Sequence, residues 1–301
     1  MDAYTLPVYV IHWNAPQWCA SSVRSLLSST GLNVLITVID NGQEVGPPVA
    51  ELLPLGVRFI RNPRNVGYAG AANVAWRDAS GQGAQYFAVL AHDVIVAPDC
   101  LYHLLVALAS RPGHGIVGPV FYDADLKNPT STGGLWTGYG ATHRIWLPTG
   151  SNGEVLEADW LHGALLLIRT ACLDQIRGFR EDFFAYVEDV DVCLRARKAG
   201  WKVGVATKAR AKELGHILPI RDHTYLITRN TLLLLRTQAP AYRFWLALVR
   251  KVRDASKAAL ASYLPWRSPA RRRLSRQFAV AQSRAILDAL LGRAGPGGDL
   301  P

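Results

Sequence analysis

Residues 86–109 read YFAVLAHDVIVAPDCLYHLLVALA and join a short apolar run to a segment of helical period. The run at residues 86–90 has the length and composition of a buried strand, and residues 98–109 repeat their apolar side chains at helical spacing. Pro98 suits the first turn of a helix, because its missing N–H would be unbonded there anyway. A strand followed by a helix is the unit from which α/β sheets are built.

The same alternation extends over the first two-thirds of the chain. Strands are expected at residues 7–12, 34–39, 57–60, 86–90 and 161–168, with one more near 203–206, and helices at 17–29, 67–79, 98–109 and 187–199. Gly200 stands where a helix C-cap uses glycine. This pattern predicts an α/β sheet with crossover helices. Between residues 121 and 159 the Gly, Thr, Asn and Pro content rises, which predicts a long loop or short hairpins over the functional face.

Composition sets the size and the setting of the protein. At 301 residues, half of them hydrophobic, the chain can build one large domain and an appendage. Its four cysteines, Cys19, Cys100, Cys172 and Cys193, are too far apart for the close pairs of zinc and redox sites. The first residues contain neither a basic n-region nor a small-residue cleavage site. We therefore expect a cytoplasmic protein.

The net charge of +10 is unevenly distributed. Residues 1–215 hold 18 Lys and Arg against 19 Asp and Glu, whereas residues 216–301 hold 15 against 4, a net of +11. Beyond Pro219 the pattern is helical, with an amphipathic, Arg-rich segment from 242 to about 291. Its apolar stretches are cut by arginines before they reach the roughly 20 residues needed to span a bilayer. We expect a domain at 1–218 and a basic helical extension at 219–301.

A basic extension on a near-neutral body indicates an anionic partner, such as a membrane surface or nucleic acid. An Arg-rich amphipathic helix fits the inner face of the plasma membrane. A solvated helical face or a homo-oligomer contact are the alternatives. Nucleic acid is disfavoured, because the extension has no groove-reading motif and its aromatic residues are not interleaved with the basic ones.

Polar residues follow the first two expected strands, as His12-Trp13-Asn14 and as Ile39-Asp40-Asn41. Ligands of open α/β sheets bind beyond the carboxyl ends of the strands, so Asp40 is a candidate to bind a ribose or a base edge. The alternative is that Asp40 and Asn41 only make a turn before Gly42.

Residues 61–73 read RNPRNVGYAGAAN, a Gly- and Asn-rich turn that opens a helix. Backbone N–H groups and a helix N-terminus can approach a phosphate at such a turn. The spacing of Gly67 and Gly70 is neither G-x-G-x-x-G nor a P-loop, so a purely structural turn remains an alternative.

Asp93 follows directly on the apolar run at residues 86–90. Diphosphate chemistry uses a hard divalent cation with oxygen ligands, and a carboxylate at a strand end can hold one. Support of the following turn is the competing role for Asp93. His216, in Glu213-Leu214-Gly215-His216, could bind the same ion, although a lone histidine is more often a surface residue.

The most informative segment is residues 183–195, FFAYVEDVDVCLR, where aromatic residues lead into three acids. Three carboxylates within four residues raise the pKa of at least one of them unless cations or donors are near, which favours a tuned base. Acids also favour a helix start, and Asp191 can pair with Arg195 at i,i+4. We assign that structural role to Asp191, the base to Asp189, and leave Glu188 open.

Taken in order, these segments resemble the family-two glycosyltransferases, and especially their bacterial rhamnosyltransferase-like branch. Members of the family have an acid–Asn pair like 40–41, an Asn-x-Gly-Tyr/Phe-Ala-Gly segment like 65–70, a Gly-Ala segment ending in Arg like 163–169, and Glu-Asp-x-Asp like 188–191. The resemblance covers about residues 7–230.

The resemblance implies a GT-A fold, a mixed sheet flanked by helices. It also implies inverting transfer from a dTDP- or UDP-sugar to a saccharide or lipid-linked acceptor of cell-surface polysaccharide synthesis. Asp189 would be the base, with Glu188 beside it in the catalytic motif. The donor-binding residues would be Asn14, Asp40, Asn65, Gly67, Asn73, Asp93 and Gly163.

The resemblance also implies a Mg²⁺ or Mn²⁺ ion held by Asp93 and His216. Ala91 stands where relatives have Asp or Asn, which leaves the ion one protein ligand fewer. Two other functions remain open. A sugar-phosphate nucleotidyltransferase would need a basic Gly-rich loop that residues 12–17 lack, and a degenerate donor-binding protein would explain Ala91 but not the retained Glu188-Asp189.

Overall fold

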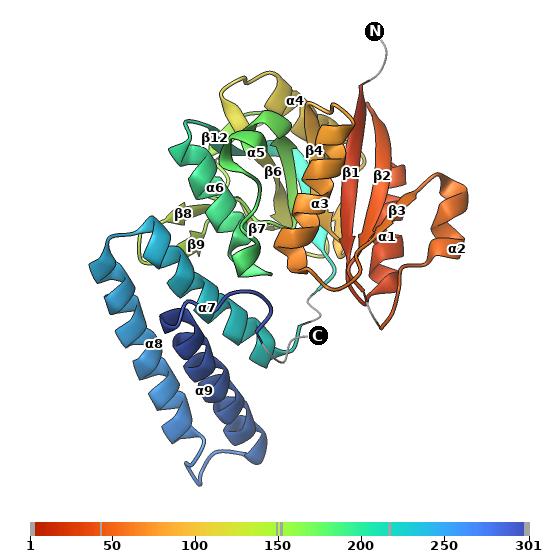
Figure 1. Cartoon of the computed structure of the whole chain (residues 1–301). Helices are drawn as coiled ribbons and strands as arrows, with labels where there is room; N and C mark the ends of the chain where they lie inside the picture. The colour runs from red at the N-terminus through yellow and green to blue at the C-terminus, as the bar shows by residue number, and fades with distance from the viewer. Residues whose placement is uncertain (1–3, 43, 149, 151–152, 216–217, 298–301) are drawn as a thin grey trace. The chain divides into compact units, whose positions relative to one another are not determined.

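A computed structural model describes residues 4–42, 44–148, 150, 153–215 and 218–297. The chain divides into two compact units (Figure 1). The first comprises Met1–Leu135, Ala141–Glu181 and Glu188–His216, and the second comprises Trp136–Gly140, Asp182–Val187 and Ile217–Pro301. Two short segments from the middle of the sequence thus belong with the C-terminal helices.

The first unit is built on a mixed sheet of ten strands in the order β10-β12-β6-β11-β4-β1-β2-β3, with β5 paired to β12 and β7 to β6. The bounds are β1 Thr5–His12, β2 Asn33–Asp40, β3 Arg58–Arg61, β4 Tyr86–Ala91, β5 Val94–Val96, β6 His114–Tyr122, β7 Pro129–Ser131, β10 Val155–Glu157, β11 Leu165–Arg169 and β12 Lys202–Glu213. A separate pair joins β8 (Gly134–Trp136) to β9 (Ala141–His143). The sheet is therefore mixed, as expected.

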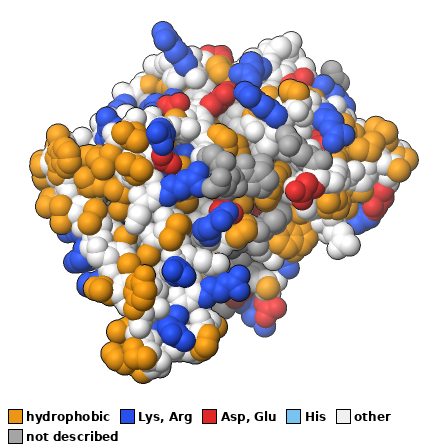
Figure 2. Space-filling view, turned by 60° about the horizontal axis from the view of Figure 1, so that its bottom comes forward, with side chains coloured by type: hydrophobic (Ala, Val, Ile, Leu, Met, Phe, Trp, Pro, Cys, Tyr) orange, Lys and Arg blue, Asp and Glu red, His pale blue; other side chains and the backbone are white. Residues whose placement is uncertain are grey.

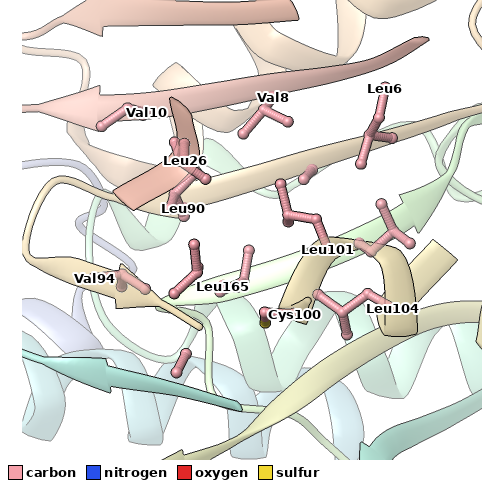
Figure 3. Packing of buried hydrophobic residues seen from close by; sticks show 14 of the residues in the cluster. Leu6, Val8, Val10, Leu26, Leu90, Val94, Cys100, Leu101, Leu104 and Leu165 are labelled. Atoms are coloured by element: carbon pink, nitrogen blue, oxygen red, sulfur yellow. The ribbon is translucent and has the colours of Figure 1, made fainter. Parts of the chain in front are cut away.

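Helices cover the sheet on both faces (Figure 1). They are α1 Pro16–Leu27, α2 Val49–Leu52, α3 Gly67–Gly81, α4 Cys100–Ala109, α5 Thr170–Ile176 and α6 Glu188–Lys198, with single 3₁₀ turns η1 Leu53–Leu55 and η2 Glu181–Phe183. Figure 3 shows Leu6, Val8 and Val10 of β1 on the side where Leu101 and Leu104 of α4 pack. The alternate residue Tyr9 points to the other face, where its hydroxyl donates to Asp78 of α3 at 2.7 Å.

The central strands deliver polar residues to one edge of the sheet. β1 runs parallel to both β2 and β4, and the register places His12 beside Asp40 and Ile11 beside Ala91. The residues that follow these three strands must therefore gather at a shared carboxyl edge. This edge is the place where the sequence predicted a ligand.

The strands expected in the first hundred residues and the four expected helices are confirmed to within a few residues. The expected strand at 161–168 begins only at Leu165, and α4 begins at Cys100, so Pro98 precedes the helix instead of standing in its first turn. Gly200 has φ +96°, as a C-cap glycine requires. The short strands β7, β8, β9 and β10 lie within residues 121–159.

Strand β6 was not expected. It contains Gly115, Gly118 and Pro119, residues that are depleted in strands. A Cβ at Gly115 would lie 2.6 Å from the sulfur of Cys172, so the glycine is required by tight packing. Gly115 therefore weakens the strand pattern in the sequence, but its lack of a side chain is also what allows β6 to pack against Cys172.

The second unit is dominated by three helices, α7 Ile220–Gln238, α8 Ala241–Ala261 and α9 Pro269–Leu290. Leu232, Leu235, Phe244, Leu248 and Ile286 form one of its apolar clusters. The Arg-rich segment expected from 242 to about 291 is helical and is divided between α8 and α9, with Pro265 and the N-cap Ser268 between them. In the described part of the chain, no helix is both long enough and apolar enough to cross a membrane.

Candidate active site

The carboxylate of Asp189 is fixed by two backbone N–H groups at the start of α6. Gly163 N–H donates to its Oδ2 at 2.9 Å, and Val190 N–H donates to its Oδ1 at 2.8 Å. A Cβ on Gly163 would lie 2.7 Å from the Cβ of Asp189, so the approach of the two segments requires glycine. The Gly-Ala segment before β11 therefore serves to hold this acid.

Burial and neighbouring groups move the pKa of Asp189 in opposite directions. Burial raises the pKa of Asp189, while the charges of His162 and His143 and the two N–H bonds oppose that rise. His162 Nε2 lies 3.1 Å from Glu213 Oε2. Burial alone would lower the pKa of His162, but Glu213, Asp189 and Asp93 together raise it. The carboxylate of Glu213 thus favours the charged form of the His162 imidazole.

The environment of the Glu188 side chain differs from that of Asp189. Its side chain is buried, and within the described residues its Oε2 has no hydrogen-bond partner. Burial, and then the charge of Asp189, raise the pKa of Glu188 well above the usual range for a carboxyl group. The two adjacent carboxyls therefore lie in unequal environments, since two backbone N–H groups bond to Asp189 while Oε2 of Glu188 has no partner among the described residues.

Asp191 forms structural ion pairs with two arginines, and the pair with Arg195 was predicted. Its Oδ2 lies 2.6 Å from Nε of Arg195 and its Oδ1 lies 3.6 Å from Nη1 of Arg180. Arg195 also donates to the carbonyls of Ile176 and Gly178. The third acid of the motif is therefore neutralised by cations and holds α6 to the preceding loop.

Tyr68 connects the acids of the two expected centres. Its hydroxyl donates to the carbonyl of Gly163 at 2.6 Å. Burial raises the pKa of Tyr68 well above its ordinary value, followed by the charges of Glu188, Asp189, Asp93 and Glu213. The acid after β4 and the acids of α6 thus act on the same hydroxyl, and the two centres form one site.

Asp93 lies beside the end of β12, because Leu214 N–H donates to its carbonyl oxygen at 2.8 Å. No group of three or more His, Cys, Asp or Glu side chains able to hold a metal occurs among the described residues. Ala91 contributes no ligand atom, and His216, the other expected ligand, lies outside the described residues. Of the two expected metal ligands, Asp93 is therefore the one that lies among the described residues.

Asp40 is almost fully buried at the end of β2. Its Oδ1 lies 3.1 Å from Nδ1 of His12 and accepts a bond from Gly42 N–H at 2.8 Å. Its Oδ2 lies 3.5 Å from Nε of Arg61. Asn14, with φ +47°, accepts from Val45 N–H at 3.2 Å. The turn before Gly42 is therefore real, and it leaves both expected nucleoside-side residues at the carboxyl edge.

The Gly-rich turn is tied to the same edge. Asn65 Oδ1 accepts from the N–H of Gly67 at 2.9 Å, and Gly67 has φ +73° as the first residue of α3. Asn41 Nδ2 donates to the carbonyl of Gly67 at 2.9 Å. Because this bond joins the end of β2 to the start of α3, the turn belongs to the same site as Asp40.

Asn73, expected among the donor-binding residues, is buried in α3. Its Nδ2 donates to the carbonyl of Phe179 and to Oε1 of Glu181, and its Oδ1 accepts from Phe179 N–H. Both N–H groups and the oxygen are used in these contacts. Asn73 thus fixes the loop at residues 178–181.

The segment that leads into α6 is strained. Phe184, Tyr186 and Val187 have φ values of +63°, +66° and +74°, which are unfavourable for residues with bulky side chains. Such a conformation persists only when its surroundings enforce it. In the sequence, this segment directly precedes the acids of α6.

Two buried residues of α7 enforce that conformation within the second unit. Asn230 Nδ2 is 2.7–2.9 Å from the carbonyls of Phe183, Ala185 and Tyr186. Arg229, fully buried, donates to the carbonyl of Phe183 at 3.1 Å. Sequence reasoning missed this pair together with Tyr68 and His162. The available signal was an Arg-Asn dipeptide shortly before the apolar run at residues 232–235.

Two family models and several curated relatives match this chain. The model of glycosyl transferase family 2 matches residues 8–158, and that of glycosyl transferase family group 2 matches residues 86–270. An N-acetylglucosaminyl-diphospho-decaprenol L-rhamnosyltransferase of Mycobacterium tuberculosis is 29% identical over 219 residues, which are 65% of this chain and 71% of the relative. The low-salt glycan biosynthesis hexosyltransferase Agl10 of Haloferax volcanii is 24% identical over 153 residues, 49% of this chain and 48% of that one.

Solved structures share the fold at low identity. The mannosyltransferase PcManGT from Pyrobaculum calidifontis, in complex with GDP-Man and Mn²⁺, superposes with a TM-score of 0.60 at 16% identity and covers 96% of this chain and 87% of its own. GalNAc-T7 with UDP, GalNAc and Mn²⁺ gives 0.63 at 15% identity, covering 97% of this chain and 58% of its own. The chain therefore belongs to glycosyl transferase family 2, is similar to its rhamnosyltransferases, and is a glycosyltransferase of GT-A fold.

Proposed function

We propose that this protein is an inverting hexosyl- or deoxyhexosyltransferase. It would move a sugar from a nucleoside diphosphate to a hydroxyl of a saccharide or lipid-linked glycan in cell-surface polysaccharide synthesis. The observation that carries the proposal is the pair of carboxyls at the start of α6. Asp189 is held by two backbone N–H groups, and the buried Glu188 beside it has a strongly raised pKa.

Asp189 would act as the general base. It would take the proton of the acceptor hydroxyl while that oxygen bonds to the anomeric carbon and the nucleoside diphosphate leaves from the opposite face, which inverts the configuration. A raised pKa brings the strength of the base closer to the operating pH. The imidazole of His162, charged through Glu213, would keep Asp189 ionised.

The donor would bind along the carboxyl edge of the central strands. Asp40 and Asn14 would contact the donor on its nucleoside side, and the turn from Asn65 to Gly67 would line the donor pocket. Gly163 would line the pocket beside the sugar. These residues all lie in the region that we propose as the catalytic domain, residues 1–218.

Asp93 and His216 would hold Mg²⁺ or Mn²⁺. The bound ion would supply positive charge to the departing diphosphate. PcManGT binds Mn²⁺ together with GDP-Man and GalNAc-T7 binds it together with UDP, which supports a divalent cation here. Because Ala91 contributes no ligand, we expect the ion to enter with the donor instead of binding tightly beforehand.

The acceptor is proposed from the relatives. The mycobacterial relative is named for transfer of L-rhamnose to a diphospho-decaprenol-linked sugar. We propose an acceptor of this lipid-linked kind for the present chain, with a dTDP- or UDP-sugar as donor. An enzyme with such an acceptor would work peripherally at the inner face of the plasma membrane, and residues 219–301 would form its basic extension.

A donor screen tests the proposal directly. The melting temperature of the full chain would be measured with dTDP-, UDP- and GDP-sugars, each with Mg²⁺, with Mn²⁺ and with a chelator. We expect one nucleoside class to stabilise the protein by mass action, and more strongly with metal. Transfer of the selected sugar to a soluble glycoside, followed by NMR of the product, then reports the anomeric configuration. Binding without transfer would favour a donor-binding protein, and retention would refute the mechanism.

A further inference from the structure

Helix α8 has two apolar faces. One face packs inside the second unit through Phe244, Ala247, Leu248 and Ala255. The opposite face is apolar as well but exposed. Its members are Tyr242, Trp245, Leu246, Val249, Val252 and Leu260, with exposures from 44% at Leu246 to 70% at Leu260. A helix that only closes a bundle would carry polar residues there.

The exposed residues form a stripe on one side of the helix. Five of them, from Tyr242 to Val252, follow one another at steps of one or three residues, and Leu260 returns to the same side after eight residues, at 3.6 residues per turn. Beyond the end of α8 the stripe gains Tyr263 and Trp266, which are 74% and 78% exposed. Apolar side chains gathered in this way on a surface mark an interaction site.

Basic residues surround the stripe. Residues 241–276 contain ten Lys and Arg but a single acid, Asp254. Arg250, Arg253 and Lys257 are exposed on α8, and Arg271 and Arg273 are exposed at the start of α9. Figure 2 shows, on the face that it displays, hydrophobic side chains directly beside Lys and Arg side chains. The partner of this surface must therefore accept apolar groups and attract positive charge.

We propose that the outer stripe of α8, with Tyr263 and Trp266, docks on the surface of an anionic lipid bilayer. The aromatic rings would enter the interface between headgroups and acyl chains, where Trp and Tyr are favoured, and the aliphatic residues would reach the acyl boundary. The flanking arginines would contact the anionic headgroups. The helix would lie in the plane of the membrane.

Charge and composition favour this partner over two others. A second copy of the chain would bring the same positive charge to the contact, and like charges repel. Nucleic acid would satisfy the arginines but would leave Val249, Val252 and Leu260 without apolar partners. Only an anionic membrane offers both negative charge and an apolar layer to one helical face.

The biological reason for docking rests on the proposed function, since a lipid-linked acceptor would be reached from such a surface. Docking itself is measured without donor or acceptor. Sugar transfer to a soluble glycoside is measured separately, so failure of the reaction and failure of the surface are distinguishable.

The test is co-sedimentation of the full chain with vesicles of phosphatidylglycerol and phosphatidylcholine, and with vesicles of phosphatidylcholine alone, at physiological salt. We expect binding to the anionic vesicles only, with a blue shift of tryptophan emission. The double variant Trp245→Ser/Trp266→Ser should bind at least about 10-fold more weakly. The matched control is Trp146→Ser, which removes a tryptophan that is 67% exposed but lies outside this surface, and it should bind like the parent chain.

A second variant tests the charge. Arg271→Gln/Arg272→Gln/Arg273→Gln should reduce binding by about 100-fold, because each lost charge near an anionic surface weakens adsorption several-fold. The proposal is overturned if anionic vesicles do not bind the chain, if neutral vesicles bind it equally, or if Trp146→Ser is as harmful as the double variant. It is also overturned if the double variant abolishes self-association or binding to duplex DNA while vesicle binding persists.

Discussion

Replacement of Asp189 by Asn is the most direct test of the base, because it removes the negative charge at nearly constant shape. The carboxylate accepts one N–H bond on each oxygen, from Gly163 at 2.9 Å and from Val190 at 2.8 Å. A side-chain amide has one accepting oxygen, so one of the two N–H groups would face an NH₂ group that cannot accept. The loss of that bond costs about 1–3 kcal/mol.

A second effect acts in the opposite direction. Burial raises the pKa of Asp189, which means that the fold bears a free-energy cost for keeping the carboxylate ionised. The neutral amide removes that cost. We therefore expect Asp189→Asn to fold, with a change in unfolding free energy of at most about 2 kcal/mol in either direction.

The effect on the reaction should be far larger. A positioned general base contributes about 10²–10⁴-fold to rate, which corresponds to a barrier lower by roughly 3–5 kcal/mol. We expect kcat for transfer to fall by this factor while donor affinity changes less than about 3-fold, because the base acts on the acceptor. Initial rates of nucleoside diphosphate release and calorimetric titration of the donor measure the two quantities.

The matched control is Asp191→Asn, two residues further along α6. It breaks the buried pairs with Arg195 and Arg180 and should cost about 3–5 kcal/mol of stability, while the molecules that remain folded keep their turnover. If Asp189→Asn retains kcat within about 5-fold, or if its activity falls only as far as its folded fraction falls, then Asp189 is not the base.

The other predictions concern the donor, the buried acid and the imidazole. Asp93→Ala should raise the donor dissociation constant by about 10-fold or more with Mg²⁺ present and change it little in a chelator; equal effects in both titrations would contradict the metal role. Glu188→Gln should gain stability over the parent chain as pH rises above about 4.3, the pKa of an unfolded glutamate, because the raised pKa of the folded carboxyl makes its ionisation destabilising. The gain should grow by about 1.4 kcal/mol for each pH unit until the pKa of the folded carboxyl is reached. Urea midpoints at pH 5 and pH 8 measure this gain, and a constant difference would show that Glu188 is not buried in its protonated form. His162→Gln should move the acid limb of the kcat profile to higher pH, because the positive charge that holds down the pKa of Asp189 is removed; a profile shifted to lower pH would contradict the proposed charge of His162.

The layout of the sheet could be predicted from the sequence because its central strands carry their own signal. The apolar runs that became β1, β2 and β4 are bounded by polar residues, and the polar residues mark the functional edge. Strand β6 carries no such signal. The tight packing at Gly115 is against Cys172, a side chain more than fifty residues away, and such a requirement is not visible locally.

The roles of residues near the expected donor site also depend on contacts that are distant in sequence. Asn73 was assigned to the donor because it follows the Gly-rich turn in the same motif. Its amide is used by Phe179 and Glu181, which are 106 and 108 residues away in sequence. His162 could not be singled out either, because its importance comes from Glu213 on another strand. A motif indicates which residues are near a site, but long-range contacts decide which of them face the ligand.

For the acidic motif, the sequence alone predicts that one acid is perturbed but not which one. Repulsion among Glu188, Asp189 and Asp191 predicts that one of them is perturbed, and the backbone donors and cations decide which. Asp191 is paired with two arginines, and the Oε2 of Glu188 lies buried without a partner among the described residues. Asp189 combines two backbone donors with a neighbouring imidazole. It is therefore the acid of the three whose ionised form is favoured by backbone donors and an imidazole instead of an arginine ion pair of the kind that holds Asp191, and the ionised form is the one that a base needs before it accepts a proton.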